Sequence, residues 1–536
     1  MHSPLKIGQR ILKCLSASAI AFLLCPIVVA QQQSSGPTDN GITAGFSSAY
    51  AGGYPTTGID TVNHYNGRVS LNLPLGNIGA RGRVGYTPAV SISRTFLLRT
   101  YQTWSYAGNP VRWSDPQYKV ISEGYNDSYD YSNFQPGLLP AVIIGRRTRD
   151  KNPDPGVIIP SSGYDCTALT KLYLRMAGTE IELRDVGTNG EPHFNSNNSP
   201  LNRGRQWHAV DGSGTLFISD ADIQDESCVD TGIPAMNGIN TVYPTGYLML
   251  EDGTRYRFVD GYPKWMRDRN GNTITFGGSQ GGEEVTDSIG RKYRLSSVGS
   301  SQGVTYKDHS GTDRTVAIIT GNLSSALRSD FAAGGVKTLQ SLLPTVVLEQ
   351  PNALFDPILT KAIRLPNGLE YHFFYTEWGE LARIEMPNGG VIEYDYAGGL
   401  ISGGTQVYRF VTAKRIFDSP GHLQARQTFA YSFPYPGPLA TVTTVKTYDA
   451  SNIVVRNERH TFLGTVFDDF RFMGWYQPFS NGRQLTFEQL NAAGSSVLRR
   501  VDNTWETIDL NGAPTSGPPQ PRLTHPTNGS VLKPCC

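Results

Sequence analysis

The chain has 536 residues, of which 17% are charged and 38% hydrophobic, and it contains 58 Gly, 34 Pro and 27 Tyr. This composition is too apolar and aromatic for a wholly disordered chain, and too rich in turn-forming residues for a helical bundle or a coiled coil. The formal net charge of +1 gives no electrostatic reason to expect a nucleic acid or an anionic membrane as a partner.

Residues 1–30 have the features of a secretory signal peptide. Basic residues end at Lys13, an apolar run extends from Cys14 to Ala30, and polar sequence begins at Gln31. The apolar run is short for a membrane span, which needs about 20 residues, although a membrane anchor is the alternative. We therefore expect removal of this segment and a protein that is secreted or held at the cell surface or in the periplasm, without a membrane span.

Export would permit disulfide bonds. Four cysteines follow the signal peptide and can pair in three ways; they are Cys166, Cys228, Cys535 and Cys536. Adjacent cysteines seldom bond to each other, because the small ring strains the peptide. The sequence therefore favours a disulfide between Cys166 and Cys228, with two buried free thiols as the alternative.

The first part of the mature chain changes character near residue 62. Residues 31–61 are rich in Gly, Ser, Thr and Gln, which predicts a flexible leader. Val69-Ser70-Leu71-Asn72-Leu73 then alternates apolar and polar residues, as a half-buried strand does. Residues 105–165 are dense in Tyr, Asn, Asp and Pro, which predicts long loops.

Further along, Asp-Gly or Asn-Gly pairs separate strand-like runs. The four pairs are Asp252-Gly253, Asn270-Gly271, Asn367-Gly368 and Asn388-Gly389. Each pair predicts a β-hairpin turn, because a type I′ turn needs a positive φ at both central residues.

The turn glycines recur with a nearly constant spacing. Successive intervals from Gly253 to Gly311 are 18, 19 and 21 residues, and Gly368 and Gly389 are 21 residues apart. Such a period indicates a stacked array in which each unit needs its neighbour to bury its apolar face.

These residues resemble a known repeat. The stretch 379–384, followed by Asn388-Gly389 and by Tyr394-Asp395-Tyr396, resembles the Rhs, or YD, repeat, and residues 253–258 and 268–276 resemble degenerate copies. Upstream, residues 65–75 resemble the start of exported bacterial Rhs-repeat proteins. The resemblance implies an all-β shell wound from a long ribbon of strands and turns, and some members of the family enclose a C-terminal toxin.

The chain departs from the toxin-carrying members, because it lacks their repeated Asp-Pro-x-Gly motifs near its end. We therefore expect an all-β fold with few helices and a partial shell. Its parts would be a β-sandwich-like module with long loops (62–245), a ribbon of Rhs/YD-like hairpins (246–465), C-terminal strands (466–510) and a Pro-rich tail (511–536). One helix is expected near Ser329–Leu343, where Gly334-Gly335 weakens the pattern.

The first hairpin allows a prediction of register. A two-residue turn at Asp252-Gly253 pairs Met249 with Tyr256. The face expected to point to the core then carries Tyr247, Met249, Tyr256 and Phe258. The opposite face carries Leu248, Leu250, Arg255 and Arg257. The same reasoning at Asn270-Gly271 pairs Trp265 with Phe276.

Local sequence motifs give only weak evidence for catalytic or metal-binding residues. The serine-hydrolase pattern G-x-S-x-G occurs at 277–281 and 299–303, but no helix pattern follows either match, so both predict Gly-Ser loops. The nine histidines lack the spacing of metal ligands. An acidic run fits no full calcium loop and predicts a solvated loop; its members are Asp220, Asp222, Asp225 and Glu226. The sequence therefore predicts no catalytic residue, no cofactor and no metal site.

The function expected from these patterns is that of an exported, non-catalytic β-scaffold with a structural, adhesive or interaction role at the cell surface. Its partner would be a glycan, which exposed Tyr and Trp rings can stack upon, or another surface protein. One alternative is a cocoon component of a toxin-delivery system. The other is a carbohydrate-binding or carbohydrate-active protein whose acid and base lie on different strands.

Overall fold

The computed structural model describes residues 53–529 with gaps. The gaps are 56–58, 66, 80–81, 93–95, 102–103, 106–111, 114–116, 123–137, 151–163, 177–178, 188–201, 210–212, 224–228, 231–240, 278–283, 297–302, 345–349, 402–404, 433–439, 465–482 and 509–519. The expected signal peptide, Cys228, Cys535 and Cys536 lie outside the described residues. Asp225 and Glu226 of the acidic run also lie outside them, as do most of the two Gly-Ser stretches.

Most of the described residues lie in strands and few lie in helices, which confirms the all-β prediction. The first strands along the chain are β1 (Gly53–Pro55), β2 (Asp60–Asn63), β3 (Val69–Pro74), β4 (Ile78–Gly79), β5 (Gly85–Tyr86), β6 (Ala89–Ile92), β7 (Phe96–Tyr101), β8 (Trp104–Ser105), β9 (Arg112–Trp113) and β10 (Gln117–Ser122). Strands β1, β2, β3 and β6 form a four-stranded antiparallel sheet.

The following 26 strands belong to one large sheet. Its first half contains β11 (Ala141–Asp150), β12 (Tyr164–Met176), β13 (Thr179–Asp185), β14 (Gln206–Ala209), β15 (Leu216–Ser219), β16 (Val229–Asp230), β17 (Thr241–Val242), β18 (Gly246–Met249), β19 (Arg255–Val259), β20 (Tyr262–Arg267), β21 (Thr273–Gly277), β22 (Glu284–Thr286), β23 (Lys292–Ser296), β24 (Gly303–Lys307) and β25 (Asp313–Asn322). Its second half contains β26 (Ile358–Arg364), β27 (Glu370–Tyr375), β28 (Leu381–Glu385), β29 (Val391–Ile401), β30 (Thr405–Ser419), β31 (His422–Ser432), β32 (Ala440–Asp449), β33 (Val454–Leu463), β34 (Gln484–Leu490), β35 (Val497–Ile508) and β36 (Gln520–Gly529).

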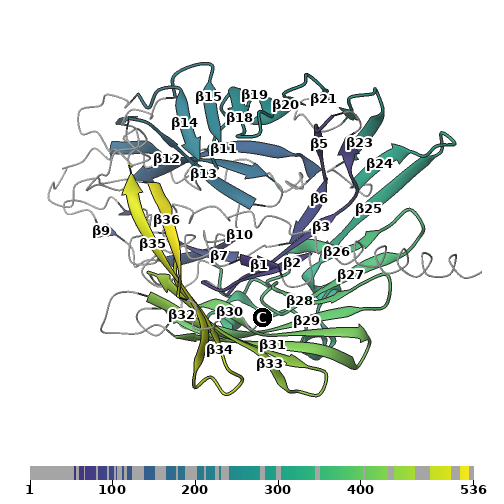
Figure 1. The fold of residues 1–536 in the computed structure, drawn as a ribbon, viewed down its shortest axis with the longest axis vertical. Coiled ribbons are helices and arrows are strands. Elements are labelled where there is room, and N and C mark those ends of the chain that lie inside the picture. Colours follow the sequence, from purple (N-terminus) through teal and green to yellow (C-terminus); the bar gives the residue numbers. More distant parts are fainter. Residues whose placement is uncertain are drawn as a thin grey trace, which may run out of the picture. The chain divides into compact units, whose positions relative to one another are not determined.

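Pairing in the large sheet follows the chain. From β18 to β36 each strand pairs antiparallel with the next one, so strands that are neighbours in sequence lie side by side (Figure 1). Strand β15 pairs with β18, so the sheet is continuous across residues 245 and 246, where the sequence predicts a module boundary. Strand β36 lies in the expected Pro-rich tail and pairs with β35.

Alternation along the strands builds the core. In β21, Ile274 and Phe276 are buried while Thr275 between them is exposed. Burial of each such side chain contributes about 1.5–3 kcal/mol. One hydrophobic cluster contains Leu71 of β3 as well as Ile392 of β29, so the N-terminal strands share the core of the large sheet.

The hairpin turns differ from the predicted type I′. In the first turn the N–H of Gly253 donates to the carbonyl of Leu250, and the N–H of Leu250 donates to the carbonyl of Thr254. Gly253 has a φ of +87°, whereas Asp260 and Asn452 are the only non-glycine residues with a positive φ in the described part of the chain. This is a three-residue loop, a type I turn closed by glycine in the left-handed region.

The extra loop residue shifts the predicted register by one. Met249 pairs with Arg255 and Leu248 with Tyr256. Tyr256 and Phe258 are buried as expected, but Leu248 is the buried apolar side chain of β18 and Tyr247 is 38% exposed. A one-residue shift turns a whole strand over. The predicted register of the second hairpin is also wrong by one residue.

In that second hairpin Trp265 pairs with Thr275 instead of Phe276. The predicted helix is also different, because the structure has two short helices, α2 (Ser329–Ala332) and α3 (Leu339–Leu342). Gly335, with a φ of +62°, lies between them and prevents one continuous helix. A 3₁₀ turn, η5 (Leu323–Ser325), precedes both.

An N-terminal segment, residues 59–92, connects distant parts of the large sheet. Near β30 the N–H of Val411 donates to the carbonyl of Gly67 over 2.8 Å. Near β20 the N–H of Arg83 donates to Asp268 over 3.0 Å. The expected flexible leader therefore contains β1 and begins β2, whose Asp60 is buried.

Candidate functional site

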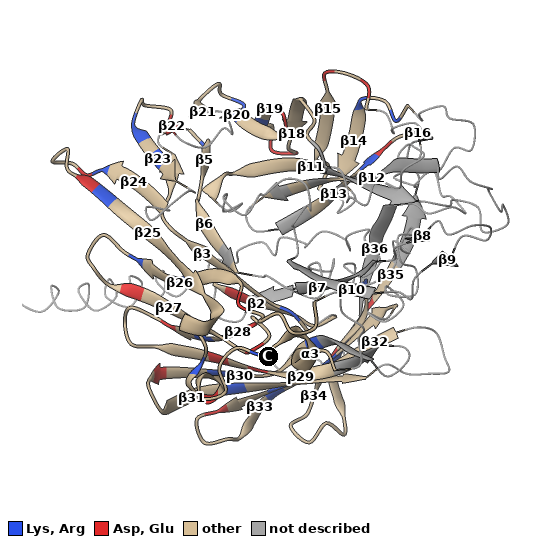
Figure 2. Ribbon diagram, turned by 180° about the vertical axis from the view of Figure 1, so that it is seen from behind, with Lys and Arg blue, Asp and Glu red and all other residues tan. Residues whose placement is uncertain are grey.

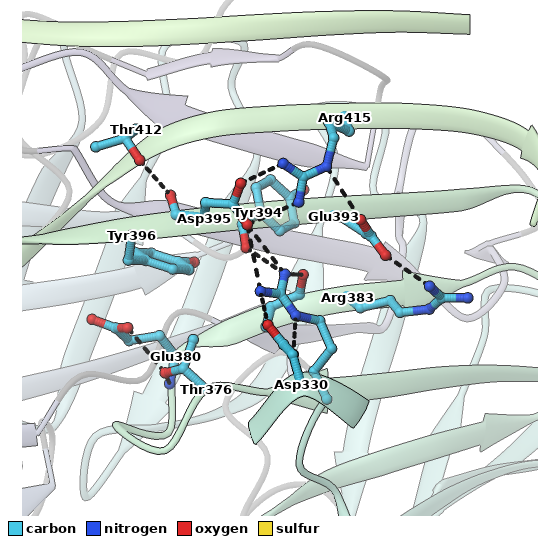
Figure 3. Close-up of polar contacts among 12 residues, drawn as sticks. Asp330, Thr376, Glu380, Arg383, Glu393, Tyr394, Asp395, Tyr396, Thr412 and Arg415 are labelled. Atoms are coloured by element: carbon cyan, nitrogen blue, oxygen red, sulfur yellow. Dashed lines mark hydrogen bonds and ion pairs between the residues drawn. The ribbon is translucent and has the colours of Figure 1, made fainter. Parts of the chain in front are cut away.

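A chain of ion pairs crosses β28, β29 and β30. Arg383 lies opposite Glu393, and Glu393 lies opposite Arg415. Nη1 of Arg383 is 2.7 Å from Oε1 of Glu393, and Nε of Arg415 is 3.2 Å from Oε2 of the same carboxylate. Nη2 of Arg415 is also 2.8 Å from Oδ1 of Asp395. Glu393 therefore lies between cationic side chains of the two neighbouring strands, β28 and β30 (Figure 3).

Arg328 joins this network from the segment before α2. Its Nη2 is 2.8 Å from Oδ2 of Asp330, and its Nη1 is 3.4 Å from Oδ1 of Asp395. Nη1 also donates to the carbonyl of Tyr394 over 2.9 Å and to that of Ala382 over 3.3 Å. The guanidinium thereby ties the helical segment to two strands of the sheet.

Two carboxylates of the network, Asp395 and Asp330, are held in the charged form. Burial alone would raise the pKa of Asp395, but the hydrogen bond and charge of Arg415, with help from Arg328, lower it overall. The hydrogen bond from Arg328 lowers the pKa of Asp330. Carboxylates of this kind stabilise strand contacts and are poor proton donors at neutral pH.

Glu380 is different from these groups. It ends the turn between β27 and β28, where Thr376 donates to its Oε2 over 3.0 Å and Nε of Arg409 is 3.1 Å from both oxygens. Burial raises the pKa of Glu380 in spite of Arg409. Arg409 also stacks on Trp378, with 5.1 Å between its Cζ and the ring centroid. A largely buried carboxyl with a raised pKa is the kind of group that general acid catalysis uses.

Two buried histidines meet where the N-terminal segment packs against β33: His64 belongs to the segment and His460 to the strand. The ring centroids of His64 and His460 are 4.5 Å apart, and Phe429, Phe462 and Phe487 surround them. Thr443 donates its hydroxyl to the carbonyl of His64 over 2.5 Å. Among the residues that the structure describes, no three His, Cys, Asp or Glu side chains are grouped as metal ligands would be.

The residues singled out from the sequence lie in the turns of the ribbon. Asp252-Gly253 and Asn270-Gly271 are in neighbouring turns, where a Cβ on Gly253 would lie 3.3 Å from Cβ of Arg269. The turns at Asn367-Gly368 and Asn388-Gly389 join β26 to β27 and β28 to β29. The side chain of His372 is 44% exposed in β27, whereas that of the next residue, Phe373, is buried. Cys166 lies in β12, where side chains at that position are not described.

Sequence reasoning missed the residue that stabilises many of these turns. Oδ1 of Asp268 accepts the N–H groups of Asn270 and Asn272, and Oδ1 of Asp287 accepts those of Ile289 and Arg291. Asp308 and Asp449 do the same. The signal was present as Asp-x-x-Gly, or Asp-x-x-Asn at Asp449, with the acceptor three residues before the left-handed position.

Comparison with known proteins does not identify a family for this chain. No family model and no curated protein matches the chain. A porin-like protein from Bacteroides uniformis is 12% identical over 57% of this chain and 90% of its own, with a TM-score of 0.13. The Tc holotoxin pore of Photorhabdus luminescens is 10% identical over 82% of this chain and 30% of its own, with a TM-score of 0.12. Scores this low do not establish a shared fold.

Within the described residues no helix has the length and apolar character needed to cross a membrane.

Proposed function

We propose that the protein is an exported β-scaffold with a structural or adhesive role, which holds its loops at the cell surface for a glycan or a surface protein. The observation that carries this proposal is the use of charged side chains as links between strands. Glu393, for example, joins Arg383 to Arg415, and acidic and basic residues are interspersed along the strands from β23 to β33 (Figure 2).

Such links suit a protein that must hold a large sheet in one shape. Partly buried ion pairs in a network constrain strand register more than isolated surface pairs do. The aspartates that cap the turns add to this, because they satisfy turn N–H groups at the ends of the hairpins. Both features serve rigidity, and a rigid framework is what positions binding loops.

Glu380 favours one rival function, that of a carbohydrate-active protein, because its pKa is raised. The test is to incubate the purified full chain with a glycan array and with a panel of soluble polysaccharides. We expect binding without release of reducing sugar. Hydrolysis that Glu380→Gln abolishes, while the neighbouring Glu377→Gln leaves it intact, would establish the rival and refute the scaffold proposal.

The export part of the proposal has its own test. Expressed in a bacterium, the protein should be recovered outside the cytoplasm with Gln31 as its first residue. N-terminal sequencing and intact-mass measurement of the recovered protein identify its first residue directly. A membrane-bound product that keeps Met1 would show that the first segment is an anchor instead.

A further inference from the structure

Three polar side chains meet in the core where β2 contacts β29 and β30. Nζ of Lys414 is 2.5 Å from Oδ2 of Asp60, and both side chains are 0% exposed. The hydroxyl of Tyr394, which is also fully buried, donates to the same Oδ2 over 2.5 Å. Tyr394 and Lys414 are direct partners across β29 and β30. Asp60 is 354 residues away from Lys414 in the chain.

This environment disfavours an ordinary ion pair. Removing an ammonium and a carboxylate from water is costly, and a dry site favours the neutral forms of both groups. Burial lowers the pKa of Lys414, although Asp60 opposes the shift. Burial and the charge of Asp60 raise the pKa of Tyr394 far above its usual value, so its hydroxyl stays a donor.

We propose that Lys414 and Asp60 become joined by an amide bond between Nζ and Cγ. The proton of the ammonium passes to the carboxylate, which leaves a neutral amine beside a neutral carboxyl group. The nitrogen lone pair attacks Cγ, while the Tyr394 hydroxyl hydrogen bonds to the carboxyl oxygen that gains negative charge. The C–O bond to the other oxygen then breaks, and that oxygen leaves as water with one proton from the carboxyl group and one from the amine. No oxidant, reductant or cofactor is needed.

Proximity of Lys414 and Asp60 contributes most to the rate of amide-bond formation. Two reacting groups held in contact can reach effective concentrations of about 10⁵ M or more, and a dry core slows the competing hydrolysis. The same chain provides natural controls. The exposed pairs Lys292–Glu284 and Lys307–Asp313 have similar distances, 2.8 and 2.9 Å, but all four side chains are more than half exposed. We expect no bond there.

Tryptic peptide mapping of the purified full chain tests the proposal. Trypsin does not cleave after a lysine whose amine is in an amide, so Phe410–Arg415 should be recovered intact, attached through Lys414 to the peptide that ends at Arg68. The branched peptide should weigh one water less than its two parts. Recovery of all Lys414 in a normally cleaved linear peptide, with no loss of water from the intact mass, would overturn the proposal.

Variants make the assignment specific. Lys414→Arg should have the intact mass calculated from its sequence, without the loss of one water. Its mobility on a denaturing gel should also differ from that of the wild type, because the 354-residue loop is no longer closed. Asp60→Asn should still form the bond, with loss of ammonia in place of water. Tyr394→Phe should lower the cross-linked fraction of freshly made protein. A loss of water that persists in Lys414→Arg would assign the bond elsewhere and refute the proposal. The wild-type peptide map decides the matter even if a variant fails to fold.

Discussion

The two core histidines make the stability of the protein depend on pH. Burial, with Arg456 acting in the same direction, lowers the pKa of His460 to about 3. Burial, His460 and Arg456 also hold the pKa of His64 well below its usual value. Both rings are therefore neutral in the folded protein at pH 7, and the unfolded chain takes up their protons first as the pH falls.

The sign of this effect follows from linkage. Because the folded pKa is depressed, the stabilisation is complete above the unfolded pKa of about 6.5 and is lost as the pH falls toward the folded value. Each histidine should lower the free energy of unfolding by about 1.4 kcal/mol per pH unit in this window. Denaturant titrations between pH 7 and pH 5 measure the slope. His460→Gln should reduce it, while the exposed His309→Gln should not, and a flat profile in the wild type would contradict the prediction.

Arg415 and Asp395 should be coupled energetically. Their side chains are 27% and 35% exposed, so solvent screens the pair and we expect a coupling of about 1 kcal/mol rather than the larger values of buried pairs. A double-mutant cycle with Arg415→Met and Asp395→Asn, read from the free energy of unfolding, measures it. Coupling indistinguishable from zero would mean that the network does not link β29 to β30.

The hairpin turn is the repeating element of the ribbon, and the loss in free energy of unfolding when a turn is disrupted can be predicted. Gly290 has a φ of +86°, and a Cβ added to it would meet nothing within 4 Å, so Gly290→Ala should cost about 1 kcal/mol through the backbone alone. Gly290→Asn should cost less, since Asn452 adopts a φ of 62° in the matching place of another turn. Equal losses for Ala and Asn, measured by chemical denaturation, would rule out the backbone explanation.

Asp287 should matter as much as the glycine that follows it. Its Oδ1 accepts two backbone N–H groups, over 3.0 and 2.9 Å, and its Oδ2 pairs with Arg291. Asp287→Ala should lower the free energy of unfolding by about 1.5–3 kcal/mol, the range for hydrogen bonds to charged groups. Asp287→Asn, which keeps one acceptor oxygen, should recover part of this loss; no difference between Ala and Asn would contradict the capping role.

These elements also show what the sequence can reveal. The positions of the turns at Gly253 and Gly271 were readable because Asp-Gly and Asn-Gly are strong local signals. The register was not, because the same pairs fit a two-residue loop and the end of a three-residue loop equally well. Only the packing of Leu248 against the core decides between them. Contacts such as Asp60 with Lys414 have no local pattern at all, since 354 residues separate them.

At the scale of the whole molecule, the disulfide between Cys166 and Cys228 stays a prediction from the sequence. Tyr164 of β12 pairs with Asp230, and Asp165 pairs with Val229 of β16. Cys228 lies outside the described residues, so this pairing ends one residue short of it.

Non-reducing peptide mapping should recover Cys166 and Cys228 in one linked pair. The bond would close a loop of 62 residues and add about 4 kcal/mol in the chain-entropy model, less any strain. Reduction should therefore lower the denaturation midpoint of the wild type but not that of Cys166→Ser. Alkylation of both thiols in unreduced, unfolded protein would show that no disulfide forms.

The order of strands has a consequence for how the chain folds. Since each strand from β18 onward pairs with its neighbour in sequence, the ribbon can lengthen hairpin by hairpin as synthesis proceeds. The N-terminal segment is the exception, because Asp60 must wait for Tyr394 and Lys414 to be made. A segment that is made long before its partners is thus among the last to reach its final contacts, and its apolar residues need protection from aggregation until β30 has been made.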